Sequence, residues 1–128
     1  MNRRQLLIAI AAVPALMGPA GAQTPPRYPE KAIRIVVPFP PGGPTDVVAR
    51  LVGDLMSRTL GQQMLVENIG GAGGTTGMTR VAQSAPDGYT LGVGNTGTQA
   101  ASPALYAQLK YDPAASFDQI SVLNFTPQ

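Results

Sequence analysis

The 128-residue sequence contains neither cysteine nor histidine. The absence of cysteine excludes a disulfide framework, a thiolate nucleophile and a zinc–thiolate site. The absence of histidine excludes Ser-His-Asp and Cys-His catalysis and any metal site that needs imidazole ligands. No GxSxG, HExxH or CxxC motif occurs either. These absences exclude much of enzymology, and the sequence indicates no catalytic residue, no metal site and no cofactor.

Charged residues are also few, at 12% of the chain, and the net charge is only +2. Two of the nine basic residues, Arg3 and Arg4, lie near the N-terminus, so the rest of the chain has seven basic and seven acidic residues. A nucleic-acid-binding protein usually carries a basic face with interleaved aromatic residues. We therefore expect no nucleic-acid partner.

Residues 1–22 have the pattern of an export signal. A basic start over residues 1–4 precedes an apolar run over residues 6–16, and residues 20–22 form a small-x-small cleavage site. The alternative is a membrane anchor, but prolines and a glycine interrupt the run, which is shorter than the ~20 apolar residues of a spanning helix. The arginine pair leaves both the Sec and the twin-arginine routes open. We expect cleavage after about Ala22 and a mature chain that is not embedded in the membrane.

A proline-rich lead-in over residues 23–30 precedes segments that alternate between strand-like and helix-like patterns. The stretch Ile33–Val37 is apolar with little alternation, as expected of a parallel strand that is covered on both faces. The helix predicted over residues 46–60 has Thr45 as its N-cap and Gly61 as its C-terminal stop. The other predicted elements are strands over residues 64–67, 89–93 and 117–125 and helices over residues 78–85 and 101–109. This order predicts that residues 31–128 form an α/β lobe with a parallel sheet.

Three loops rich in small residues follow three successive predicted strands, over residues 38–45, 68–77 and 94–98. In an open parallel sheet such loops gather beyond the carboxyl ends of the strands, where ligands bind. Glycine lets a ligand approach the backbone closely, and the amides of a helix N-terminus favour an anion. The sequence therefore predicts an anion-binding cleft at this edge, and the loop that ends at Thr45 forms half of it.

Several loop residues have more than one interpretation. Residues 92–97 match GxGxxG, but no acidic residue follows at the end of a next strand, so a turn is favoured over a dinucleotide site. The loop of residues 71–74 lacks the lysine of a P-loop. Asp46 either caps the helix or acts as a ligand or base, and beside an anion its carboxylate is expected to face the loop. Phe39 either packs in the core or covers the ligand.

Strings of residues along nearly all of the chain after the signal form a specific pattern. They are Tyr28-Pro29-x-Lys31, Phe39-Pro40-Pro41-Gly42-Gly43-x-Thr45-Asp46-x-x-Ala49-Arg50, Leu60-Gly61-Gln62, Val66-Glu67-Asn68, Gly71-Ala72-Gly73-Gly74, Ala85-Pro86-Asp87-Gly88-Tyr89-Thr90-Leu91 and Tyr111-Asp112-Pro113. In this order and spacing, the chain resembles the extracytoplasmic solute receptors of tripartite tricarboxylate transporters, the Bug family. It departs from that family at Ile69-Gly70, where many members have Arg-Pro, and at Pro44. We expect these departures to alter loop rigidity or ligand preference.

The resemblance implies one lobe of a periplasmic-binding-protein-like (type II) clamshell that closes on a di- or tricarboxylate, an acidic amino acid or an aromatic acid. It implies a periplasmic receptor and not an enzyme, with membrane permease subunits or a sensor kinase as partner. The loops matching residues 39–45 and 71–74 would hold one ligand carboxylate through backbone groups and ordered waters, and residues 95–98 would line the cleft floor. The implied site residues are Phe39, Pro41, Gly42, Gly43, Thr45, Asp46, Gly71, Ala72, Gly73, Gly74, Thr96 and Thr98.

The resemblance covers the N-terminal part of the family only. Family members are more than twice as long as this chain, and residue 128 matches the region where their chain crosses to the second lobe. We therefore expect a fragment that carries half of the site. Two alternatives stay open. One is a sensor or a nucleotide- or phosphate-binding domain that uses the same loops, and the other is a truncated remnant without a ligand.

Overall fold

The computed structural model describes residues 27–124, and the predicted export signal lies outside them. Three parallel strands, β1 (Ile33–Val37), β2 (Met64–Asn68) and β3 (Thr90–Gly92), form a sheet in the order β2-β1-β3. The helices α1 (Pro44–Leu60) and α2 (Thr75–Ala82) connect the strands, and the short helix α3 (Ser102–Leu105) follows β3. The predicted α/β lobe with a parallel sheet is confirmed. Within residues 27–124, no helix is both long enough and apolar enough to cross a membrane.

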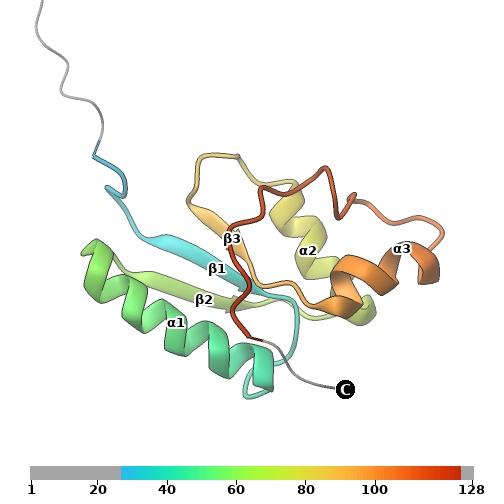
Figure 1. Ribbon diagram of the computed structural model, residues 1–128, viewed down its shortest axis with the longest axis horizontal. Coiled ribbons are helices and arrows are strands. Elements are labelled where there is room, and N and C mark those ends of the chain that lie inside the picture. Colours follow the sequence, from blue (N-terminus) through green and yellow to red (C-terminus); the bar gives the residue numbers. More distant parts are fainter. Residues whose placement is uncertain (1–26, 125–128) are drawn as a thin grey trace, which may run out of the picture.

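The two connecting helices pack on opposite faces of the sheet, as right-handed crossovers on either side of a central strand require. Ala49 of α1, which runs alongside β1 and β2 in Figure 1, packs on Ile35 and Val37. On the other face, Met78 and Val81 of α2 fill the space beside Gly92. Val36 is paired with Gly92, and its side chain points to that same face because neighbouring strand residues alternate. Apart from the exposed Arg34, the central strand is therefore buried on both faces, as its largely apolar sequence predicts.

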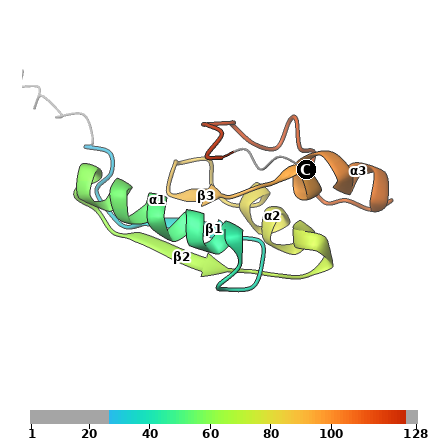
Figure 2. The ribbon, with the colours of Figure 1, turned by 60° about the horizontal axis from the view of Figure 1, so that its bottom comes forward.

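The parallel strands all point toward the end of the molecule that carries α3 (Figures 1 and 2). The loop between β1 and α1, the loop between β2 and α2 and the turn after β3 all lie at this edge. The topological expectation that the three small-residue loops share one edge of the sheet is confirmed.

Several helix boundaries differ from the sequence predictions. α1 begins at Pro44 with Gly43 as its N-cap, and Thr45 is not the cap, because proline has a helical φ and lacks the amide that the first turn leaves unbonded. α2 begins at Thr75 and not at residue 78, since a 3₁₀ turn (Ala72–Gly74) leads directly into it, and it ends at Ala82 and not at residue 85. After β3, a π-helical turn (Gly97–Ala101) continues into α3, which ends at Leu105 and not at residue 109. The left-handed stop at Gly61 is as predicted.

The strand predicted over residues 117–125 is wrong for the part that the structure describes, because residues 117–124 have no strand. Ile120 and Val122 are 78% and 67% exposed. A preference for β-structure expresses how well a side chain fits a half-buried pleated surface, and a strand also needs a neighbour for its backbone hydrogen bonds. Within the described residues β3 pairs only with β1, so the β-branched composition of residues 117–124 has no partner strand.

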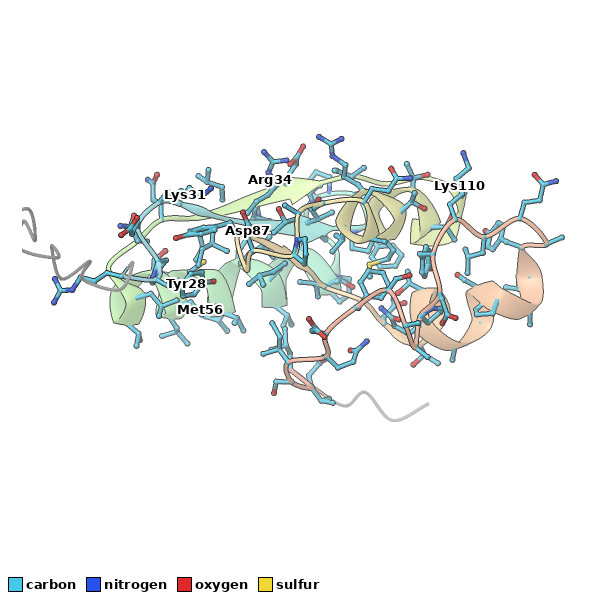
Figure 3. All side chains as sticks on the ribbon, turned by 90° about the horizontal axis from the view of Figure 1, so that it is seen from above. Tyr28, Lys31, Arg34, Met56, Asp87 and Lys110 are labelled. Atoms are coloured by element: carbon cyan, nitrogen blue, oxygen red, sulfur yellow. The ribbon has the colours of Figure 1, made fainter. Side chains whose placement is uncertain are left out.

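The end of the proline-rich lead-in is held at the opposite end of the sheet from α3. The Tyr28 and Tyr89 rings pack in a tilted arrangement with centroids 5.1 Å apart, and the Tyr28 hydroxyl donates to the Gly88 carbonyl at 2.7 Å. Lys31 lies 4.3 Å from the centre of the Tyr89 ring and 3.9 Å from the Asp87 carboxylate. Figure 3 shows Tyr28, Lys31 and Asp87 far from α3. These contacts therefore hold the start of the lobe without involving the glycine loops.

Candidate functional site

The carboxylate of Asp46, in the first turn of α1, faces the loop that precedes the helix, as predicted for a site that takes an anion. Asp46 is only 2% exposed. Its Oδ2 accepts hydrogen bonds from the Gly42 amide at 2.9 Å and from Arg50 Nε at 3.0 Å, and its Oδ1 accepts one from Asn68 Nδ2 at 2.9 Å. The acid is therefore a structural group that holds the loop, and it is turned away from solvent.

These three donors control the ionisation of Asp46. Arg50 has the largest effect, followed by the Gly42 amide and the Asn68 side chain, and together they hold the pKa of the Asp46 carboxyl well below its ordinary value of 3.8. The folded state thus has the lower pKa. The ionised carboxylate stabilises the fold above about pH 4, and this stabilisation is lost as the pH falls below that value toward the lowered pKa.

We expect Asp46→Asn to lower the thermal unfolding midpoint at pH 7 and to flatten the further fall of the midpoint between about pH 4 and pH 2. The measurement compares unfolding midpoints of the variant and the unmodified chain at each pH. Asp54→Asn is the matched control, because Asp54 also pairs with an arginine four residues later on α1, at 2.6 Å, but both partners are largely exposed. A steep acid-side fall that survives in Asp46→Asn would contradict the role assigned to this carboxylate.

The bond to Asp46 also decides which loop amides are available to a ligand. The Gly42 amide is already engaged. Within residues 27–124, the amides of Gly43, Thr45 and Asp46 have no acceptor, and Pro44 has no amide hydrogen. The first amides of a helix lack intrahelical partners and carry the positive end of its dipole. The loop after β1 therefore has three amides without an acceptor at the start of α1, and two of them, those of Gly43 and Thr45, belong to residues that are not buried.

The loop after β2 has a comparable set of donors. Gly71, Ala72, Gly73 and Gly74 all have positive φ, at 125°, 46°, 65° and 93°. The Gly74 amide donates to the Gly71 carbonyl, whereas the amides of Gly71, Ala72 and Gly73 have no acceptor among the described residues. The two loops lie side by side, since a Cβ built on Gly70 would lie 3.9 Å from Pro40 Cδ. Two groups of unengaged amides thus occupy the same sheet edge.

The third loop packs against the first two at Gly74. A Cβ on Gly74 would lie 2.7 Å from Thr98 Cγ2 and 3.2 Å from Phe39 Cζ. Thr98 is fully buried, and its hydroxyl accepts from the Asn95 amide at 3.0 Å and donates to the Asn95 carbonyl at 3.1 Å. The buried Tyr111 hydroxyl donates to the Thr98 carbonyl at 2.6 Å. Phe39 and Thr98 therefore support the loops from inside, where their side chains meet at Gly74.

The remaining predicted residues lie on the surface. Pro41 and Thr96 are exposed. Thr45 and Thr96 both line a groove of about 910 Å³ that residues 116–124 also border. The residues of the glycine loops, Phe39, Gly42, Gly43 and the segment 71–74, do not line this groove. Thr45 and Thr96 thus share a groove that the other predicted residues of the first two loops do not line.

Sequence reasoning assigned no role to Asn68, Arg50 or Tyr106, and all three contact the loops. Arg50 and Asn68 bond Asp46 as described, and a Cβ on Gly73 would lie 2.7 Å from the Tyr106 hydroxyl oxygen. The spacing of Asp46 and Arg50, four residues apart on a helix, is a signal for their ion pair. No local signal connects Tyr106 with Gly73.

Comparisons with known proteins agree with this architecture. Residues 48–128 match the family described as the tripartite tricarboxylate transporter family receptor, TctC. An Agrobacterium vitis protein from the ttuE-ttuC' intergenic region is 43% identical over 127 residues, which are 99% of this chain and 36% of that protein. The chain spans about a third of the length of the curated relatives it matches.

Solved structures match over about 70% of the chain. MatC from Rhodopseudomonas palustris with bound malate is 52% identical, with a TM-score of 0.68, over 70% of this chain and 31% of that chain. A second R. palustris protein, with adipate, is 36% identical, with a TM-score of 0.67, over 69% of this chain and 29% of that chain.

Proposed function

Because the chain belongs to the tripartite tricarboxylate transporter receptor family, whose members are periplasmic binding proteins and not enzymes, we propose that it supplies half of a binding site for a small carboxylate. The observation that supports this most directly is the pair of loops with unengaged amides at one edge of the sheet. Amides and a helix N-terminus attract an anion without a cationic side chain. MatC is similar to this chain and holds malate, and another relative holds adipate.

In this proposal each loop contributes amides to one ligand carboxylate. The amides of Gly43, Thr45 and Asp46 act from the start of α1, and those of Gly71, Ala72 and Gly73 act from the loop after β2. Phe39, Gly42, Gly74 and Thr98 shape these loops, and Pro41 and Thr96 lie at the rim. Residues 1–22 direct export, and the mature chain acts in the periplasm. There it passes its ligand to membrane permease subunits or a sensor kinase.

The test follows the backbone amides directly. We expect the amide resonances of Gly43, Gly71 and Gly73 in a ¹⁵N-labelled chain to shift saturably with malate or adipate, with an apparent Kd of about 1 mM or weaker, because one lobe buries only part of a ligand. A tricarboxylate, glutamate and benzoate complete the panel, and inorganic phosphate distinguishes carboxylates from other anions. Intact mass of protein from the periplasmic fraction tests cleavage after Ala22. Absence of shifts with every carboxylate at tens of millimolar would refute the site.

Gly43 offers a matched pair of variants. Its φ of −76° suits proline, which removes the amide donor, and it suits alanine equally well, which keeps the donor. A Cβ there would meet only the Pro40 carbonyl oxygen, at 3.7 Å. A hydrogen bond to a charged group contributes about 1.5–3 kcal/mol, so Gly43→Pro should weaken carboxylate binding about tenfold or more, and Gly43→Ala should bind like the unmodified chain. Equal affinities of the two variants would show that this amide does not contact the ligand.

A further inference from the structure

The side chain of Asn68, the last residue of β2, connects three elements. Its Nδ2 donates to the Phe39 carbonyl at 3.0 Å and to Asp46 Oδ1 at 2.9 Å, and its Oδ1 accepts from Arg50 Nη2 at 3.0 Å. One carboxamide therefore bonds the loop after β1, the first turn of α1 and the second turn of α1. Aspartate has the same shape but cannot donate, and leucine has no polar atom, so this set of bonds requires an amide side chain.

These bonds begin where the backbone ladder between β1 and β2 ends. The register pairs Val37 with Asn68, and the last backbone bond runs from the Ile69 amide to the Val37 carbonyl at 2.9 Å. Beyond that point the two chains enter the loops. The bond from Asn68 to the Phe39 carbonyl extends the connection two residues past Val37, into the loop itself.

The network holds the loop after β1 at two points. Asn68 bonds the carbonyl of Phe39, and Asp46, which is itself bonded by Asn68 and Arg50, bonds the amide of Gly42. The unengaged Gly43 amide follows directly after the second point. Asn68 in turn precedes the loop that carries the amides of residues 71–73. The distance between the two groups of amides therefore depends on this side chain.

We propose that Asn68 is a positioning residue that holds the two amide-bearing loops at the spacing a single carboxylate requires. The inference rests on the proposed function for its effect on binding, while its effect on the loop is independent of any ligand. Donors that are already held in place lose less conformational freedom when an anion binds, so loosening this contact should weaken binding.

The test combines hydrogen exchange with ligand titration on the labelled chain. In Asn68→Ala we expect the Gly42 amide to exchange at least about tenfold faster and malate or adipate to bind about tenfold more weakly, with cooperative unfolding retained. Glu67→Gln is the matched control on the same strand, because Glu67 forms an exposed ion pair with Arg34 at 3.3 Å. It should leave both measurements within about twofold.

The possible outcomes distinguish a failure of the inference from a failure of the proposed function. Unchanged Gly42 exchange in Asn68→Ala would overturn the inference, and so would faster exchange with unchanged affinity. If the unmodified chain binds no carboxylate, the proposed function fails, but the exchange comparison still decides whether Asn68 holds the loop. If Asn68→Ala does not fold, Asn68→Asp takes its place. That variant keeps the shape of the side chain and an acceptor for Arg50 but loses both donated bonds, to Phe39 and to Asp46, and unchanged Gly42 exchange in it would also overturn the inference.

Discussion

Replacing Gly74 with alanine is expected to lower the free energy of unfolding by about 3–5 kcal/mol, as the sum of left-handed strain and overpacking. Gly74 has a φ of 93°, which L-residues rarely adopt. Its Cβ would lie 2.7 Å from Thr98 Cγ2 and 3.2 Å from Phe39 Cζ. Thr98 has no room to move, because it is fully buried and bonded to Asn95 and Tyr111.

Denaturant unfolding of Gly74→Ala and Gly61→Ala, measured in parallel, separates the backbone strain from the overpacking. Gly61 also has a left-handed φ, 69°, but a Cβ there would meet no atom within 4 Å. Gly61→Ala should therefore cost only the backbone strain, about 1–2 kcal/mol. Because small domains have stabilities of about 5–15 kcal/mol, the Gly74 variant should lose a large fraction of its free energy of unfolding. Similar losses in the two variants would mean that the three loops do not meet at Gly74 as described.

Replacing Gly77 with alanine is the second change with a large expected effect. It should lower the free energy of unfolding, although helix propensity alone would predict an increase. Gly77 lies in α2, where alanine is favoured over glycine by about 1 kcal/mol. A Cβ on Gly77, however, would lie 2.6 Å from the Ile69 carbonyl oxygen and 2.9 Å from Pro38 Cα. Both are backbone atoms just past the carboxyl ends of β2 and β1, so neither can rotate away. Overpacking against them should cost about 3 kcal/mol, which exceeds the helical gain, so we expect a net loss of about 2 kcal/mol.

Gly53 in α1 provides the control for Gly77. It is also a buried helical glycine that faces the sheet, but a built Cβ would meet Ile35 Cδ1 and Met64 Cβ, both at 3.3 Å. These are side-chain atoms that can shift slightly, so Gly53→Ala should change the free energy of unfolding by less than about 1 kcal/mol. Equilibrium unfolding of both variants tests the difference. A stabilised Gly77→Ala would show that α2 sits farther from the strand ends than described.

Asp46 and Gly74 indicate how the candidate site is built. The side chains of Asp46, Asn68 and Thr98 shape it by forming hydrogen bonds with the backbone of the loops. The groups left without an acceptor among the described residues are backbone amides. In the proposed function the ligand thus meets backbone, and the side chains determine where that backbone lies. Substitutions of these side chains should change affinity through loop geometry.

Local sequence signals determined much of this lobe. The run Ile33–Val37 is β1 as predicted, because a strand covered on both faces is largely apolar, and its one charged residue, Arg34, is exposed. Gly61 ends α1, because glycine adopts the left-handed cap without strain. The alternation of strands and helices also predicted the shared edge for the three loops, since parallel strands end on the same side. The inward orientation of Asp46 was predicted on the hypothesis that the loop beside it binds an anion.

Tertiary structure decided the rest. Asn68 and Phe39 are 29 residues apart, and the contact among Gly74, Phe39 and Thr98 joins three separate loops, so no local pattern could show that they meet. The engagement of the Gly42 amide by Asp46, which removes one donor from the candidate site, depends on how the loop folds back on the helix. The failure of residues 117–124 to form a strand has the same origin. Propensity acts within a few residues, whereas a strand, a buried hydrogen bond or a steric contact requires a partner that only the packed chain brings into place.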